Sequence, residues 1–225
     1  MESMDTLKKS AMLARLRNSK GFSLVEMAIV LVIIGIIIGA IIKGQDLILN
    51  SRAKQVASAA STWRNLAMAY LDRNGRLPGD GGKTGIIKTF TGYSGATGEI
   101  KSTMTTAPPQ PVAVGGMTFY TYFGNTTGTV LGRNIIAICK DPTCTVKFTA
   151  DELEIIKAVD NGIDGSADAG MGQFRGATVV TPGDPSAASG YIVTATGDTT
   201  TTGATKDWVL ANNYVAAIWA FDRPF

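Results

Sequence analysis

The sequence predicts an α+β fold, in which one long N-terminal helix packs on a small antiparallel β-sheet. Two observations predict it. An apolar run from Phe22 to Ile42, in which Glu26 is the only charged residue, is followed by apolar residues at helical spacing as far as Tyr70. The rest of the chain is rich in glycine and threonine and holds short β-branched or aromatic runs, which are typical of strands. The long helix therefore has a membrane half and an amphipathic half.

Charge and composition narrow the classes of function. The formal net charge of the 225-residue chain is +3, and this excess lies in the first 21 residues, which hold five basic and two acidic side chains. Because the remainder is balanced, general basicity gives no reason to expect nucleic-acid binding. The chain has no histidine, which is the commonest general base and metal ligand. With no P-loop or nucleophile motif either, we expect no enzymatic activity.

The apolar run is long enough to cross a membrane. As a helix, residues 22–42 would span about 31 Å, close to the ~30 Å hydrocarbon core of a bilayer. The basic flank precedes the run, so residues 1–20 should stay cytoplasmic and the C-terminal domain should be exported. No small-residue cleavage site follows the run, so any cut would fall before it, at Gly21. Gly35 and Gly39 would let two helices approach closely, although glycines are common in membrane helices generally.

Glu26 is unusual because a carboxylate in hydrocarbon costs a few kcal/mol at a helix centre and less near an end. If the chain begins at Phe22, its α-amino group is cationic at neutral pH. The amine of a neighbouring copy could then pair with Glu26 in a bundle of parallel helices. Head-to-tail contacts of this kind build helical filaments unless the rotation between neighbouring subunits closes them into a ring. In the alternative interpretation, Glu26 only extends to the cytoplasmic interface of a plain anchor.

The stretch KGFSLVEMAIVLVIIGII resembles the cleavage-and-methylation signature of type IV prepilins and pseudopilins. The shared pattern is a basic leader, Gly21 at the cut, Phe22 after it, Glu26 as the fifth residue of the mature chain, and a continuous apolar helix. The resemblance covers roughly residues 15–75. It implies that a membrane aspartic prepilin peptidase cleaves between Gly21 and Phe22 and methylates the Phe22 amine. It also implies that Glu26 sets the register of subunits in the filament.

The resemblance implies a structural subunit of a type IV pilus-like filament, either a pilin or a minor pilin. The implied partners are other copies and other pilins, the peptidase, the inner-membrane assembly platform and the membrane, with no nucleic acid required. The precursor would lie in the bacterial inner membrane with a periplasmic domain, and the product in a pilus or a periplasmic pseudopilus. One alternative is a pseudopilin of a type II secretion system. Another is an unprocessed single-pass anchor carrying a binding module, against which the Gly21–Phe22 junction and Glu26 argue.

The chain then divides into four predicted segments. They are a leader that is removed, a transmembrane and assembly helix, an amphipathic continuation of that helix, and a globular β-rich domain: residues 1–21, 22–43, 44–75 and 76–225. In the amphipathic part, apolar residues recur at steps of three and four, which predicts a stripe packed on the sheet: Val56, Ala59, Trp63, Leu66 and Tyr70. We expect Trp63 and Tyr70 to be core residues, and Asn74-Gly75 to end the helix.

The globular part should hold several short elements. Residues 79–116 are interpreted as a loop region with one or two short strands. Five later runs predict strands: Met117–Phe123, Asn134–Cys139, Cys144–Phe148, Tyr191–Ala195 and Tyr214–Phe221. The second and third of these would form a hairpin through the turn Lys140–Thr143. Thr149 and Glu152 have the spacing of a capping box, which predicts a short helix to about Val159. The Thr/Gly-rich stretch 197–207 should be an exposed loop.

Cys139 and Cys144 are the only cysteines. A zinc site would need a second pair of ligands, and the chain has none. A disulfide that closes a tight turn is expected if this part lies in an oxidising compartment. Otherwise they are two small hydrophobic residues on either side of the turn.

One acidic loop holds candidate metal ligands. Within VDNGIDGSADAG, Asp160, Asn161, Asp164 and Asp168 could supply oxygen atoms to Ca²⁺. The spacing is not that of an EF-hand, and Asn-Gly and Asp-Gly are also ordinary turn formers. A calcium site here would favour the pseudopilin alternative. No other cofactor is expected.

Overall fold

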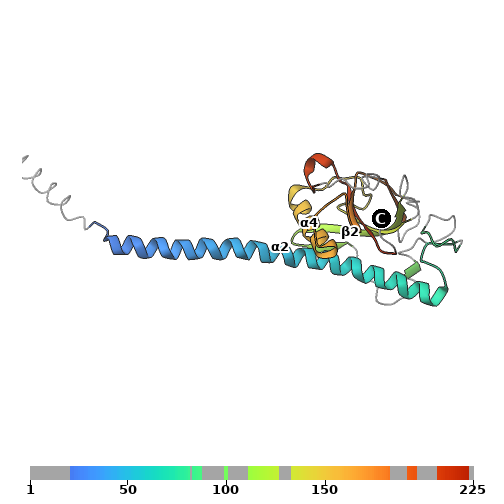
Figure 1. Ribbon diagram of the computed structural model, residues 1–225, viewed down its shortest axis with the longest axis horizontal. Coiled ribbons are helices and arrows are strands. Elements are labelled where there is room, and N and C mark those ends of the chain that lie inside the picture. Colours follow the sequence, from blue (N-terminus) through green and yellow to red (C-terminus); the bar gives the residue numbers. More distant parts are fainter. Residues whose placement is uncertain are drawn as a thin grey trace, which may run out of the picture. The chain divides into compact units, whose positions relative to one another are not determined.

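The computed structural model describes residues 21–81, 83–87, 99–100, 111–126, 133–182, 192–196 and 207–222. Within these ranges it has a long helix α2 (Leu24–Asn74), a second helix α4 (Ala150–Asp164), a short 3₁₀ turn η2 (Leu210–Asn212) and seven strands (Figure 1). The predicted α+β fold is confirmed. The chain divides into two compact units, Met1–Asp46 and Leu47–Phe225, which are described separately.

The second unit contains the sheet. Its strands are β1 (Val112–Val114), β2 (Met117–Thr126), β3 (Asn134–Cys139), β4 (Phe174–Ala177), β5 (Val179–Pro182), β6 (Ile192–Thr196) and β7 (Ala216–Ala220). The order is β4-β7-β3-β2-β6-β5, with β1 paired to β2. The strand pairs in the described residues are antiparallel except β2 with β6, which run parallel. A parallel pair needs a long crossover, and the chain between β2 and β6, which includes β3 and α4, supplies it.

The part of α2 in this unit packs through a narrow stripe. Its fully buried residues follow each other at steps of three and four: Ala53, Val56, Ala60, Trp63, Ala67 and Tyr70. Ala59 and Leu66, which were expected in the stripe, are only half-buried, because the buried line runs one residue further along at both points. Trp63 is 1% exposed and meets Phe123 of β2 edge-on, with ring centroids 6.0 Å apart. Trp63 and Tyr70 are therefore core residues, as predicted.

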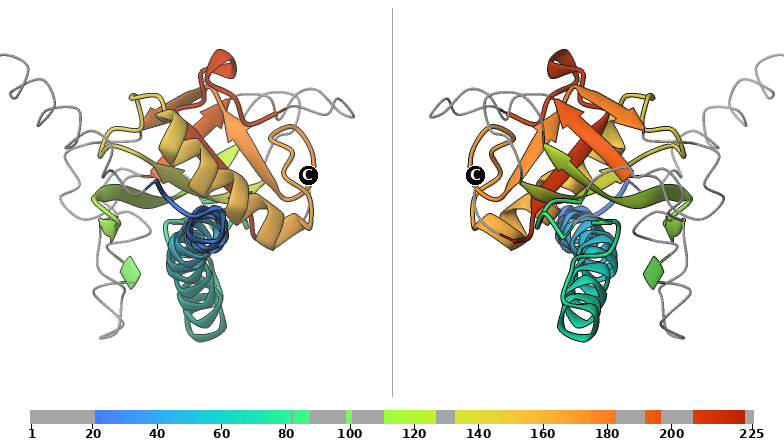
Figure 2. Two further views of the ribbon diagram at one scale, coloured as in Figure 1. Left: turned by 90° about the vertical axis from the view of Figure 1, so that its left-hand side faces the viewer. Right: turned by 90° about the vertical axis from the view of Figure 1, so that its right-hand side faces the viewer.

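In the second unit, α2 and α4 cover the same face of the sheet (Figure 2). Alternate residues of a strand point to opposite faces. In β3, Ile136 and Ile138 belong to the core that α2 and α4 share. The intervening Ile135 and Ala137 belong to a separate core on the other face. Every residue of β3 is buried, which explains why the five residues after Asn134, IIAIC, are all apolar.

The β1–β2 hairpin depends on two glycines. Val114 pairs with Met117, so Gly115 and Gly116 form a two-residue turn, and their φ angles are +58° and +85°. Such a turn needs left-handed backbone at both positions, which glycine adopts readily. The Arg52 side chain of α2 lies so close to Gly115 that an added Cβ would be 2.4 Å from its Nε. This turn confirms a short strand within residues 79–116.

The predicted hairpin between Asn134–Cys139 and Cys144–Phe148 is wrong. Residues 144–148 form no strand. Cys144 has a φ of +55°, and the backbone N–H groups of Thr143, Thr145 and Val146 donate to the Asp141 carboxylate instead of to a neighbouring strand. A side chain thus competes with the sheet for the backbone donors.

Other boundaries differ less. Helix α4 runs to Asp164, five residues beyond the predicted end, where Gly165 takes up a left-handed conformation (φ +77°). The α2 end at Asn74 and the α4 capping box of Thr149 and Glu152 are confirmed. Strands β4 and β5 were not predicted, because FRGA and VVTP are short and show no clear alternation. Nearly all of the loop predicted at 197–207 lies outside the described residues.

Candidate processing and assembly site

The candidate site lies where α2 begins. Gly21, Phe22 and Ser23 are outside the helix and exposed, and Phe22 keeps 76% of its surface accessible. The Ser23 carbonyl accepts the first helical hydrogen bond, from the Met27 N–H at 3.1 Å, which makes Ser23 the N-cap residue. The predicted Gly21–Phe22 junction therefore sits in exposed, non-helical backbone.

Glu26 and Ser23 form a variant of the capping box, in which Ser23 Oγ accepts from the second helical residue, Val25, instead of the third. The Ser23 N–H donates to Glu26 Oε2 at 2.8 Å, and the Val25 N–H donates to Ser23 Oγ at 3.2 Å. Two backbone donors that the helix cannot satisfy itself are thereby paired. The Glu26 carboxylate also lies at the positive end of the helix dipole, which favours an anion there. Glu26 is exposed, so the carboxylate remains reachable by a second group.

The apolar half of α2 has no cover within the described chain. Residues 24–42 are all exposed, and α2 is long and apolar enough to cross a membrane. Soluble surfaces rarely expose contiguous apolar patches of this size. Lipid or other apolar helices must therefore cover this segment, which indicates that the chain is anchored in a membrane.

Gly35 and Gly39 lie one turn apart within this apolar segment, so both belong to one face of the helix. No atom of another residue lies within 4 Å of a Cβ added to either glycine, apart from neighbours along the helix. The space beside them is therefore open to a second helix. Their packing role stays a prediction.

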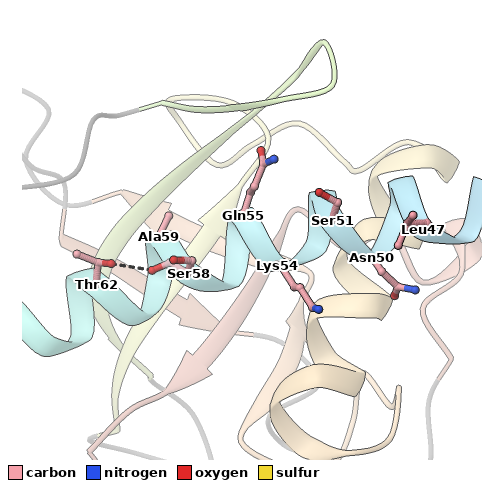
Figure 3. Close-up of a pocket in the computed structure, with 8 residues that line it drawn as sticks. All are labelled: Leu47, Asn50, Ser51, Lys54, Gln55, Ser58, Ala59 and Thr62. Atoms are coloured by element: carbon pink, nitrogen blue, oxygen red, sulfur yellow. Dashed lines mark hydrogen bonds between the residues drawn. The ribbon is translucent and has the colours of Figure 1, made fainter.

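A shallow depression follows the exposed side of α2 in the second unit (Figure 3). Eight residues line it: Leu47, Asn50, Ser51, Lys54, Gln55, Ser58, Ala59 and Thr62. Thr62 Oγ1 donates to the Ser58 carbonyl at 2.8 Å, so this hydroxyl is engaged within the helix. Among the lining residues Lys54 is the only titratable one. The lining of the depression therefore includes no carboxylate, imidazole or thiol group.

Cys139 and Cys144 are joined by a disulfide in the structure, with a Cα–Cα distance of 5.1 Å. Both residues are buried, in the core on the sheet face away from the helices. The bond closes the short turn between the end of β3 and residue 144. The Tyr122 hydroxyl of β2 donates to the Pro142 carbonyl at 3.0 Å and ties the turn to the sheet.

Asp141 organises the same turn. Its carboxylate accepts from the Thr143, Thr145 and Val146 N–H groups, each at 3.1 Å, and from the Thr143 hydroxyl. Partial burial raises the pKa of this carboxyl, but the hydrogen bonds outweigh it and hold the pKa below its usual value. The turn is therefore held by an ionised side chain as well as by the disulfide.

The candidate calcium ligands Asp164 and Asp168 have backbone hydrogen-bond partners in the structure. Among the residues that the structure describes, no three His, Cys, Asp or Glu side chains gather as a metal ion requires. Asp164 Oδ2 accepts from the Phe174 N–H at 2.8 Å, and Asp168 Oδ1 accepts from the Gly170 N–H at 2.9 Å. The Asn161 side chain is exposed. These groups brace the end of α4 and the turn after it, and calcium binding stays a prediction.

Asp160 is the buried member of this group. Its side chain is fully buried, and Oδ2 accepts from the Asp168 N–H and from Trp208 Nε1, both at 2.7 Å. Burial raises the pKa of Asp160 to about 7, although these two hydrogen bonds lower it, and the nearby Asp164 and Asp168 carboxylates raise it further. One carboxyl thus joins α4, the turn at 168 and the segment around Trp208.

The hydrogen-bonding roles of Ser23 and Asp141 were not predicted from the sequence. Ser23 stands three residues before Glu26, and the SLVE stretch fits the S-x-x-E capping box that was recognised at Thr149. Asp141 precedes a proline in a six-residue loop, where an aspartate commonly accepts from backbone N–H groups two or more residues later. Both signals were present in the sequence.

Comparison with known proteins bears on the first unit. Residues 16–42 match the family model of the prokaryotic N-terminal methylation motif. No curated protein and no solved structure matches the chain. The matched residues include Gly21, Phe22, Glu26 and the exposed apolar half of α2 as far as Ile42. The N-terminal segment of this chain therefore carries the signature of type IV pilin and pseudopilin precursors.

Proposed function

We propose that this chain is the precursor of a structural subunit, a pilin or minor pilin, of a type IV pilus-like filament. The observation that carries the proposal is the junction itself: an exposed, non-helical Gly21–Phe22 pair directly before a capped apolar helix with a carboxylate in its first turn. A prepilin peptidase would cut between the two residues and methylate the new Phe22 amine. The mature chain would then leave the membrane through an inner-membrane assembly platform.

The chemistry of assembly follows from the new terminus. Cleavage creates a cationic amine on every subunit, next to the carboxylate of Glu26. A neighbour's amine is the partner of opposite charge that this carboxylate needs in an apolar bundle, where charge-assisted hydrogen bonds are the strong ones. Each subunit then offers one amine and one carboxylate to different neighbours. Such a contact is heterologous and propagates as a helix.

The same processing would serve a pseudopilin of a type II secretion system, because the motif is common to both. A calcium site would favour this alternative. The acidic loop adds no support for such a site, because backbone N–H groups already donate to the carboxylates of Asp168 and Asp164. Both functions are structural, and neither needs catalytic chemistry from this chain. The precursor would sit in the bacterial inner membrane with residues 47–225 in the periplasm.

The test is intact mass with N-terminal fragmentation on native protein from sheared surface material and from inner membrane. A chain that starts at methylated Phe22 in the sheared material is the expected result. The same processed chain confined to membranes would instead indicate the pseudopilin. A chain that keeps residues 1–21 in both fractions would overturn the proposal in favour of an unprocessed anchor.

Replacement of Glu26 by alanine tests the assembly role. We expect Glu26→Ala to insert into the membrane normally but to lower filament yield roughly 10- to 100-fold, which corresponds to losing one hydrogen bond between charged groups. Asp46→Ala is a matched control, since Asp46 is an exposed carboxylate of α2 beyond the apolar run. A normal yield of sheared filament from Glu26→Ala would remove the role assigned to this residue.

A further inference from the structure

The capping box gives Glu26 a partner inside its own chain. Glu26 Oε2 accepts from the Ser23 N–H at 2.8 Å, and Ser23 Oγ accepts from the Val25 N–H at 3.2 Å. The pairing assigned above requires Glu26 to meet the amine of another copy. The structure therefore shows what holds this carboxylate before a neighbour is present.

We propose that Ser23 is a positioning residue that acts through Glu26: it holds the Glu26 carboxylate against the start of α2 so that the side chain is already ordered when a neighbouring amine arrives. The inference rests on the proposed function, because it presumes that the amine is made by cleavage after Gly21.

The physical basis is preorganisation. An exposed glutamate samples many rotamers, and ordering such a side chain is among the larger entropy losses of any residue type. Within the capping box Oε2 is fixed by the Ser23 N–H, while the second carboxylate oxygen can accept the incoming amine. Binding groups that are ordered in advance lose less entropy on association. The box also keeps the carboxylate at the helix N-terminus, where the dipole stabilises it before assembly.

The hydroxyl of Ser23 is the part that can be varied. Ser23→Ala removes the acceptor for the Val25 N–H and loosens the box, but it keeps the backbone N–H that donates to Glu26. Loss of an N-cap hydroxyl typically corresponds to about a fivefold change in an equilibrium constant. We therefore expect filament yield from Ser23→Ala to fall about fivefold. Ser23→Thr keeps a hydroxyl and should restore the yield.

The experiment compares filament yield and N-terminal mass for the full chain and the variants Ser23→Ala, Ser23→Thr and Glu26→Gln, and for Ser23→Ala combined with Glu26→Gln. If Ser23 acts through Glu26, the Ser23→Ala loss should shrink when Glu26 is already replaced, because residues that share one interaction are not additive. Hydrogen exchange of the Ser23 and Val25 amides in the processed, detergent-solubilised subunit gives a second reading. Both amides should be protected in the parent chain, and the Val25 amide should exchange faster in Ser23→Ala.

The outcomes separate the two proposals. Unprocessed parent chain, or parent chain that never forms filaments, counts against the proposed function. Normal parent filaments together with a full yield from Ser23→Ala would overturn the positioning role alone. An equal loss from Ser23→Ala with and without Glu26→Gln would also overturn it, since Ser23 would then act independently of the carboxylate.

Discussion

At the scale of single residues, Asp160 couples the fold to pH. In the folded chain burial keeps its pKa near 7, whereas an unfolded chain would lose this proton near pH 4. The folded state therefore binds the proton more tightly throughout this window. Since stability falls with rising pH wherever the folded state holds more protons, raising the pH from about 4 to about 7 should weaken the fold.

We expect Asp160 to contribute a loss on the order of 2–4 kcal/mol of unfolding free energy across that window. Asp160→Asn keeps an oxygen that can accept from Trp208 and the Asp168 N–H, but it does not titrate. Urea denaturation of parent and variant at pH 4.5 and 7.5 measures the effect. The pH dependence that the parent shows and the variant lacks is due to Asp160, because Asp164, whose pKa burial also raises, is present in both proteins. Equal pH dependence in the two proteins would contradict the assignment.

Gly21 allows a test of processing that leaves the fold untouched. A Cβ added at Gly21 has no atom of a non-adjacent residue within 4 Å, and Gly21 lies in exposed, non-helical backbone, so we expect the substitution to leave the fold intact. We expect Gly21→Leu to keep residues 1–21, because a bulky side chain would not fit the peptidase at the scissile bond. Gly44→Leu, another glycine with open space around it, should be processed normally. Intact mass of membrane fractions checks both, and a mature Gly21→Leu chain would move the cut elsewhere.

At the scale of elements, the turn of residues 139–146 has two independent restraints. A disulfide that closes so short a loop should contribute roughly 2 kcal/mol by limiting the unfolded chain. The Asp141 carboxylate separately holds three backbone N–H groups. We expect Cys139→Ala with Cys144→Ala to lower the unfolding free energy by about this amount while the Thr145 and Val146 amides stay protected from exchange. Adding Asp141→Ala should expose them, and loss of protection in the cysteine variant alone would show that Asp141 does not suffice.

The elements also show how far sequence reasoning reaches. Helix α2 and its end at Asn74 were predictable because periodicity and the Asn74-Gly75 stop agree locally. The Thr149–Glu152 box was predictable for the same reason. The strand predicted at 144–148 is absent, because the Asp141 side chain accepts from the backbone N–H groups of Thr145 and Val146 that a strand would have used. Strands β4 and β5 were missed because each is four residues long, and their pairing with β7 and β6 is set by tertiary contacts.

The candidate site divides in the same way. Gly21, Phe22 and Glu26 were identified from the order of residue types along the chain, since leader, glycine, aromatic residue and carboxylate are all local features. The four oxygen ligands proposed for calcium were grouped by proximity in sequence alone. In the structure α4 extends through Asp160 and Asp164, which are four residues apart and lie on one face of the helix. Each carboxylate nevertheless has its own backbone donor, the Asp168 N–H for Asp160 and the Phe174 N–H for Asp164. Density of acidic residues in a sequence says nothing about convergence of their oxygen atoms.

At the scale of the whole molecule, the two units make different demands on their surroundings. The first exposes an apolar helix that needs lipid or other helices. The buried core of the second unit consists of residues at or beyond Ala53. All the buried residues of α2 belong to this core. The boundary between the two units therefore lies inside α2, before the buried stripe, and not at the end of the helix.

We expect a fragment of residues 47–225 to be a soluble monomer that unfolds cooperatively, because removing residues 1–46 takes away no member of its core. A fragment of residues 75–225 is the matched control. It lacks Trp63, Tyr70 and the rest of the α2 stripe, so it uncovers the sheet face that these side chains bury, and it should aggregate or bind a hydrophobic dye. Sedimentation and thermal denaturation of both fragments check this. A shorter fragment as stable as the longer one would mean that α2 contributes nothing to the domain, and an aggregating longer fragment would mean that the anchor half of the helix is needed to fold it.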